Sequence, residues 1–151
     1  MKFEITQITA EDTYPLRHAL LRKGRPLSSC ILEGDDAPET IHLGTFFEND
    51  LIGIGSAFLN PCPQYPDKTG VQLRAIAVAP NHQRKGVATQ LIQQLLKKIQ
   101  FQLNPECIWL NARISASLLY LSNGFQPVGD PFDIVPIGTH QRFIKNYSHD
   151  A

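Results

Sequence analysis

Cysteine is scarce in this sequence, and long apolar runs are missing. The three cysteines, Cys30, Cys62 and Cys107, are odd in number and form no Cys-x-x-Cys pair, which favours a reducing cytoplasm as the location. No apolar run is long enough to span a bilayer, and the opening residues, MKFEITQITAEDTY, lack the apolar core of a signal peptide. We therefore expect one cytoplasmic domain, residues 1–151, large enough to fold without disulfides or a metal.

An excess of charge of one sign is also missing. Lys and Arg together number 14, as do Asp and Glu, and a neutral domain lacks the basic surface that nucleic-acid binding requires. We expect neither nucleic acid nor a membrane as a partner. The charge is nevertheless uneven, with −4 in residues 1–70, +5 in residues 71–113 and −1 in residues 114–151. The basic excess therefore lies in the middle of the chain.

Residues 71–101, VQLRAIAVAPNHQRKGVATQLIQQLLKKIQF, combine a buried strand with an amphipathic helix. The strand is predicted for residues 71–79, which are apolar or small except Gln72 and Arg74. The helix follows, because apolar residues recur at every fourth position from Val87 onward. The first amides of a helix lack partners inside it and carry partial positive charge. This junction is therefore predicted to bind an anion, usually a phosphate.

The turn between this strand and helix contains Gly86, which leaves the backbone open to a ligand. Arg84 and Lys85 add mobile positive charge beside it. The P-loop pattern and the dinucleotide-binding Gly-x-Gly-x-x-Gly are both absent. The pattern that is present is Gln-x-x-Gly-x-Ala, from Gln83 to Ala88.

Two motifs in this order resemble those of the GNAT superfamily of N-acetyltransferases, and the ending also resembles a small bacterial subgroup of poorly defined substrate. The resemblance covers roughly residues 41–147. The matching residues are Gln83, Gly86 and Ala88 in the first motif, and Ala116, Tyr120, Gly124 and Phe125 in the second.

This resemblance implies an α/β (α+β) fold in a single domain. Its sheet is mixed but mostly antiparallel, is flanked by helices, and has a splay between its two central strands. Those strands are expected at residues 73–79 and 108–111. Because many members of the family pair through late strands, a homodimer is expected by analogy alone.

The activity that the resemblance implies is acetyl transfer from acetyl-CoA to a primary amine of a small molecule or peptide, directly within a ternary complex. The alternative is a non-catalytic module that binds acyl-CoA as a sensor or interaction domain. No ligand spacing supports a metal site. The implied contacts with acetyl-CoA are Ile76, Ala77 and Val78 on the strand, Gln83, Arg84, Lys85, Gly86, Val87, Ala88 and Thr89 at the helix start, and Asn111, Ala116 and Tyr120 downstream.

Tyr120 matches the family tyrosine near the CoA sulfur, where a phenol can donate a hydrogen bond or a proton to the leaving thiolate. The family often has Asn seven residues before this tyrosine, but Arg113 stands there, so Asn111 is the expected substitute. The general base stays open between His42, His140 and Glu33, with histidine the side chain best tuned for the role at neutral pH.

Strand alternation places Arg74 on the face of Gln72 and Ile76. An arginine is rarely buried without a partner. Arg74 is therefore expected either to bind a substrate carboxylate or to form an ion pair with Glu33 or Asp133. The resemblance suggests that Arg22 and Arg25 line the same acceptor site.

The remaining elements follow from turn and cap signals. Asp12 or Thr13 is expected to cap a helix with Pro15 in its first turn, with Leu16, Leu20 and Leu21 facing the core. Strands are expected at residues 3–8, 41–47, 51–59, 107–112, 125–128 and 140–147. Ser115 is expected to cap a short helix that runs to Asn123, and the segment between the last two strands is expected to be a loop.

Overall fold

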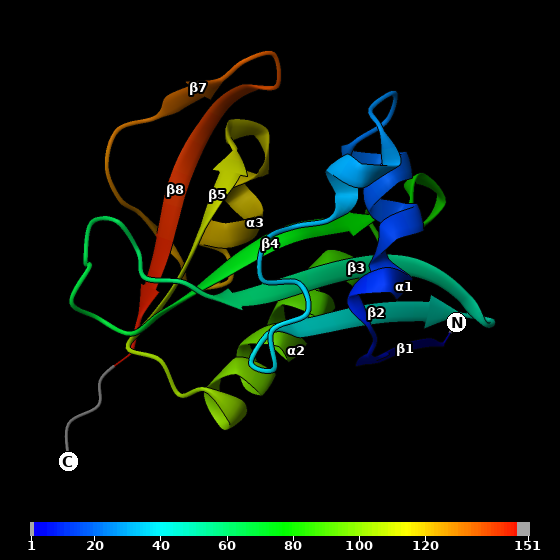
Figure 1. The fold of residues 1–151 in the computed structure, drawn as a ribbon, viewed down its shortest axis with the longest axis horizontal. Coiled ribbons are helices and arrows are strands. Elements are labelled where there is room, and N and C mark those ends of the chain that lie inside the picture. The colour runs from blue at the N-terminus through cyan, green and yellow to red at the C-terminus, as the bar shows by residue number, and fades with distance from the viewer. Residues whose placement is uncertain (1, 148–151) are drawn as a thin grey trace.

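The computed structural model describes residues 2–147, which form one mixed sheet with helices on both faces. The sheet order is β1-β2-β3-β4-β5-β8-β6, and β7 also pairs with β8. Among the described strands, β4 and β5 are the one parallel pair of neighbours (Figure 1). The strands are β1 (Phe3–Gln7), β2 (Ile41–Phe47), β3 (Asp50–Leu59), β4 (Gly70–Val78), β5 (Cys107–Arg113), β6 (Gln126–Pro127), β7 (Phe132–Ile134) and β8 (Gly138–Asn146).

Two groups of helices cover the sheet. The main core packs between one face and α2, whose apolar stripe includes Leu91 and Leu95. The other face carries α1 and the π-helical turn η1 that continues it (Figure 1). No helix within residues 2–147 is long and apolar enough to cross a membrane. The helical elements are α1 (Ala10–Leu16), η1 (Arg17–Leu21), η2 (Leu27–Cys30), η3 (Pro80–His82), α2 (Val87–Gln102), η4 (Ile114–Ala116) and α3 (Ser117–Leu121).

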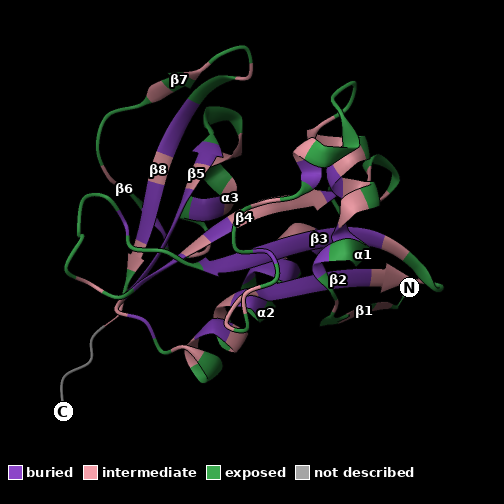
Figure 2. Cartoon of the chain, viewed as in Figure 1, coloured by how far each residue is buried: buried purple, intermediate pink, exposed green. Residues whose placement is uncertain are grey.

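The two central strands separate soon after they meet, as expected for the splay. β4 and β5 pair only at Gly70, Val71 and Gln72, opposite residues 107–109. Residues 73–78 of β4 therefore continue with no β5 partner. Figure 2 shows this half of β4 as partly exposed while its neighbour β3 is buried.

A bulge at Ala75 breaks the alternation of side chains in β4. Ala75 has a positive φ of 56°, and the register with β3 shifts at this point. Arg74 stays on the α1 face, where its guanidinium lies 5.9 Å from the centre of the Phe58 ring. Ile76 instead turns towards α2 and packs on the main core. The expectation that Arg74 and Ile76 share a face was therefore wrong, because the extra residue reverses the alternation.

Several predicted element boundaries were also wrong. Thr9, not Asp12 or Thr13, caps α1, because Thr9 and Asp12 form a reciprocal capping box. Pro15 accordingly lies near the end of α1 rather than in its first turn. The short helix α3 begins at Ser117, with no side-chain cap from Ser115. The loop predicted before the last strand contains β7, which forms because β8 provides a partner for it.

Candidate functional site

The segment from Gln83 to the start of α2 is a turn held in place by a hydrogen bond, rather than a loop without such a contact. The Gln83 side chain donates through Nε2 to the carbonyl oxygen of Val78 at 3.0 Å, which ties the turn to the end of β4. Arg84 and Gly86 both have positive φ, 63° and 80°. Gly86 is the N-cap of α2 and provides no side-chain cap. The first amides of a long helix are thus presented at the end of the open strand.

The space beside Gly86 is open. A Cβ placed on Gly86 would meet no atom within 4 Å, and Arg84 and Lys85 are exposed on the same turn. Val87, Ala88 and Thr89 form the first turn of α2. The residues predicted to hold the pyrophosphate are therefore brought together in one place, with backbone donors, a positive helix end and two cations.

Tyr120 lies on α3 inside the main core. It is 6% exposed and contacts Phe125 edge-on at 5.9 Å between ring centres, and Phe143 at 6.0 Å. Burial raises the pKa of Tyr120 to about 12, because a phenolate is poorly solvated there. The Tyr120 hydroxyl therefore stays protonated at neutral pH and is available as a donor.

Asn111 and Ala116 lie on the second central strand and just before α3. The Asn111 side chain is half-buried and accepts a hydrogen bond from Nε of Arg142 at 2.9 Å. The Arg142 guanidinium lies 5.0 Å from the centre of the Trp109 ring. Asn111 therefore has a protein partner already, and its contact with a donor stays a prediction.

His42 lies under α1 with both ring nitrogens engaged. It is 4% exposed. Its Nδ1 is 2.7 Å from Ser56 Oγ, and its Nε2 is 2.9 Å from the carbonyl oxygen of Asp35. A carbonyl can only accept, so Nε2 carries a hydrogen, and in the neutral ring Nδ1 accepts from Ser56. No nitrogen of His42 is left for a substrate, and a base role would require this network to open.

The same network contains a buried ion pair that the sequence analysis missed. Arg17 is 2% exposed and donates through Nη1 and Nη2 to the two carboxylate oxygens of Asp35, at 2.8 and 3.0 Å. Its Nη2 also donates to Ser56 Oγ at 3.1 Å. Asp35 further accepts from the amide of Leu32. This clamp, the Arg17–Asp35 ion pair with its hydrogen bonds, fastens η1 to the loop before β2. η1 in turn forms one wall beside β4.

Burial of Arg17 also corrects the expected core face of this helix. Leu16, Leu20 and Leu21 are only half-buried, and Arg17 takes the interior position. The physical reason is the carboxylate of Asp35, which pairs with the guanidinium and makes its burial tolerable.

His140 offers one free ring nitrogen. Its Nδ1 lies 2.9 Å from the carbonyl oxygen of Gly138, so Nδ1 carries a hydrogen, and in the neutral ring the lone pair is on Nε2. Nε2 has no hydrogen-bond partner within residues 2–147, and the ring, 7% exposed, stacks on Phe132. Glu33, the third candidate base, is exposed, and its carboxylate forms no hydrogen bond or ion pair among the described residues.

Asn60 links the two halves of the sheet on the face of Gln72. Its side chain donates to Gln72 on β4, and its carbonyl oxygen accepts from the indole of Trp109 on β5. Arg74 follows Gln72 on this face.

Comparison with known proteins gives the family. Residues 42–127, more than half of the chain, match the family described as acetyltransferase (GNAT) domain. The chain belongs to the GNAT acetyltransferase family. This confirms the resemblance, the class of enzyme and the fold predicted from the sequence. YitI of Bacillus subtilis (strain 168), described as an uncharacterized N-acetyltransferase, is 31% identical to this GNAT chain over 137 residues, 91% of each.

Solved structures agree on the fold. The crystal structure of ElaA from Escherichia coli matches with a TM-score of 0.79 and 16% identity, over 96% of this GNAT chain and 100% of that one. An aminoglycoside 6'-N-acetyltransferase complexed with coenzyme A matches with a TM-score of 0.74 and 15% identity, over 98% and 99%. Within residues 2–147 no group of three or more His, Cys, Asp or Glu side chains is placed to hold a metal ion.

Proposed function

We propose that this GNAT chain transfers an acetyl group from acetyl-CoA directly to a primary amine on a small molecule or a peptide. The observation that carries the proposal is an open strand leading to an open helix start. Beyond Gln72, β4 has no partner on its β5 side, and α2 begins after it with no side-chain cap. An extended pantetheine arm can pair with strand backbone as an added strand does, and the helix start suits the pyrophosphate.

The reaction forms one bond and breaks another. The amine nitrogen attacks the thioester carbonyl carbon, the C–N bond forms, and the C–S bond breaks to release CoA. The amine must lose a proton to a base, and the developing oxyanion needs a donor. We assign the oxyanion donor to the amide of Ile76, which lies on the open half of β4.

We assign the base to His140 rather than to His42 or Glu33. The bond from His140 Nδ1 to Gly138 holds the ring in the form whose Nε2 accepts a proton. His42 has both nitrogens engaged inside the clamp. Glu33 is exposed in a turn, where nothing fixes its carboxylate.

We assign to Tyr120 a hydrogen bond to the leaving thiolate. Its pKa of about 12 lies well above the ordinary thiol value of about 8.5. Complete proton transfer from the phenol to a thiolate is therefore uphill, whereas a hydrogen bond from a neutral phenol to an anion is favourable. The proton that the thiolate finally takes then comes from solvent.

Calorimetric titration with acetyl-CoA and with CoA tests the donor site. We expect binding in the micromolar range for both, followed by release of free thiol when an amine acceptor is added to the acetyl-CoA complex. Binding without thiol release for any amine would favour the alternative, a non-catalytic acyl-CoA-binding module. A folded protein that binds neither ligand would contradict the proposal.

A further inference from the structure

Arg74 is a half-buried cation without a counter-ion. It lies on β4 just beyond the last residue that pairs with β5, on the face covered by α1 and η1. No carboxylate within residues 2–147 forms an ion pair with it, and its guanidinium donates no hydrogen bond there. Neither Glu33 nor Asp133 braces it, which removes that alternative among the described residues. A guanidinium partly withdrawn from water is unfavourable unless something anionic pairs with it.

A second arginine lies close to the first. η1 packs against β4, and Arg22 ends η1, half-buried. Within residues 2–147, its one side-chain hydrogen bond runs from Nη1 to the carbonyl oxygen of Leu21 at 3.3 Å. Burial and then the charge of Arg22 lower the pKa of Arg74, so the two cations repel each other across this face. Both keep most of their donors unused.

The one acid whose charge acts noticeably on Arg74 among the described residues is already paired. Asp35 raises the pKa of Arg74 as the weakest of four influences, and its two carboxylate oxygens accept from Arg17 and from the amide of Leu32. The clamp therefore holds η1 in place beside β4 without cancelling the charge of Arg22 and Arg74. The chain thus builds a positive site rather than a neutral one.

We propose that the acceptor amine also carries a carboxylate, and that Arg22 and Arg74 bind this carboxylate beside the open half of β4. The acceptor is then an amino acid or a short peptide with a free carboxyl end, not a polyamine. This inference rests on the proposed acetyl transfer and adds the acceptor class. Arg74 precedes Ile76 by two residues, about 6–7 Å along the strand, so the carboxylate site and the assigned oxyanion donor belong to the same stretch of β4.

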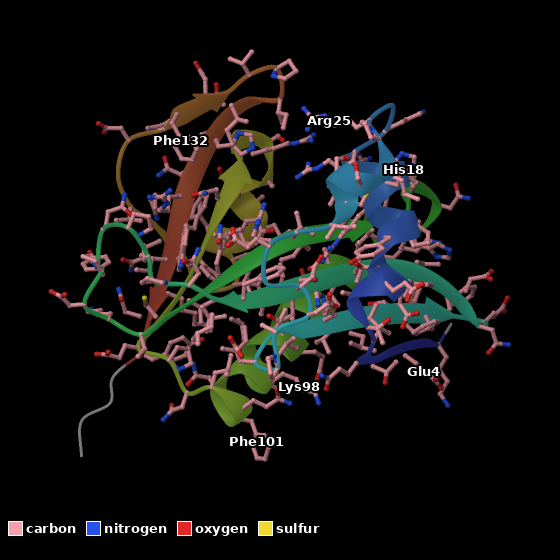
Figure 3. The ribbon with its side chains drawn as sticks, viewed as in Figure 1. Glu4, His18, Arg25, Lys98, Phe101 and Phe132 are labelled. Carbon is pink, nitrogen blue, oxygen red and sulfur yellow. The ribbon has the colours of Figure 1, made fainter. Side chains whose placement is uncertain are left out.

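Arg25 extends the same positive face outwards. It is exposed on the segment beyond η1, and Phe132 lies across from it on β7 (Figure 3). An exposed arginine at this position attracts an anionic acceptor at longer range without forming its pocket. Arg22 and Arg74 therefore carry the recognition, and Arg25 affects mainly the rate of association.

The test measures thiol release from acetyl-CoA with matched acceptors. The panel pairs each of several L-amino acids and dipeptides with its carboxamide, which keeps the amine and removes the negative charge, and includes spermidine. We expect kcat/KM for the best carboxylates to exceed that for their carboxamides by on the order of 100-fold, as a lost charge-assisted pair implies. Equal use of carboxamides, or use of spermidine alone, would overturn the inference.

Variants locate the carboxylate. Arg74→Gln and Arg22→Gln should each remove most of that preference while leaving the KM for acetyl-CoA unchanged, and Arg74→Lys should restore it only in part, because an ammonium lacks the two-pronged geometry. Lys23→Gln removes the same charge from the adjacent exposed residue and should change nothing. A preference that survives both glutamine variants would place the carboxylate elsewhere and overturn the assignment.

Two further measurements distinguish a failure of this inference from a failure of the proposed function. Without acceptor, Arg74→Gln should leave the melting temperature unchanged or raise it, since it removes an unpaired cation; a clear fall would mean that Arg74 braces the sheet. If the protein binds CoA but releases no thiol with any carboxylate acceptor, this inference fails while the donor site stands. If it binds neither CoA nor acetyl-CoA, the proposed function fails first.

Discussion

Tyr120 is the residue on which the leaving-group chemistry depends. Replacing it with phenylalanine removes one donor and leaves the packing against Phe125 and Phe143 in place. We expect kcat for thiol release to fall roughly 10- to 100-fold, the value of a hydrogen bond to a charged group, with CoA affinity unchanged by calorimetry. Turnover equal to that of the wild type would remove Tyr120 from the mechanism.

The same residue makes stability depend on alkaline pH. Folding raises the pKa of Tyr120 from 10.0 to about 12, so the unfolded chain loses the phenolic proton first as pH rises. The stabilisation is complete below pH 10 and disappears between about pH 10 and 12, a loss of about 2–3 kcal/mol in the free energy of unfolding. Urea unfolding across this range should show a smaller loss in Tyr120→Phe than in the wild type. Tyr65→Phe, at an exposed ring, is the control.

Single residues differ in how far the sequence predicts them. Gln83, Gly86 and Tyr120 belong to short motifs, and the local sequence pattern was enough to predict the turn and the short helix on which they lie. The side-chain partners of Arg17 lie 18 and 39 positions away along the chain, so no local pattern connects them. An arginine between leucines in a predicted helix was the one available signal, and only the fold identifies its counter-ion.

At the scale of elements, we expect substitutions at the start of α2 to weaken acetyl-CoA binding most. Gly86→Asp adds a negative charge where the pyrophosphate is proposed to bind, and we expect CoA binding to become undetectable by calorimetry. The space beside Gly86 is open, so the fold should persist with a loss of about 1–2 kcal/mol for the positive φ. Gly86→Ala carries the same backbone strain without the charge. It should bind CoA more weakly than the wild type but better than Gly86→Asp, and equal affinity of all three proteins would contradict the site.

The clamp that joins η1 to the loop before β2 should matter more for stability than for acetyl-CoA binding. Asp35→Asn leaves Arg17 buried without a full counter-charge, which we expect to cost about 3–5 kcal/mol in urea unfolding. Replacing both residues by apolar ones, Arg17→Met with Asp35→Leu, should recover much of that loss. A double variant as unstable as Asp35→Asn would show that the clamp is not an electrostatic unit.

Elements were predictable where their own residues decide them. The apolar period of α2 predicted its start, and the turn signals beside β2 gave its bounds, Ile41–Phe47, without error. α1 was misplaced because Thr9 and Asp12 cap it one turn earlier than expected. β7 was missed because a strand of three residues exists only through its pairing with β8.

At the scale of the whole molecule, the burial of every cysteine bears on whether the acetyl group passes directly to the acceptor or first to the enzyme. Cys30, Cys62 and Cys107 are all at most 1% exposed, so none is presented to carry an acetyl group. We expect initial rates with varied acetyl-CoA and acceptor to give intersecting reciprocal plots, as for a ternary complex, and no acetylated protein by mass spectrometry. Parallel plots with a covalent adduct would contradict direct transfer.

The short contact between β4 and β5 has a consequence for how the free protein moves. Within residues 2–147, three residue pairs form the only strand ladder between the sheet halves β1–β4 and β5–β8, and this ladder ends before residues 73–78. We therefore expect local opening of the sheet to begin at that end, with faster solvent exchange of those backbone amides of residues 73–78 that point away from β3. Acetyl-CoA lying along β4 would close this opening. The molecule that the enzyme consumes would then also complete its sheet in each catalytic cycle.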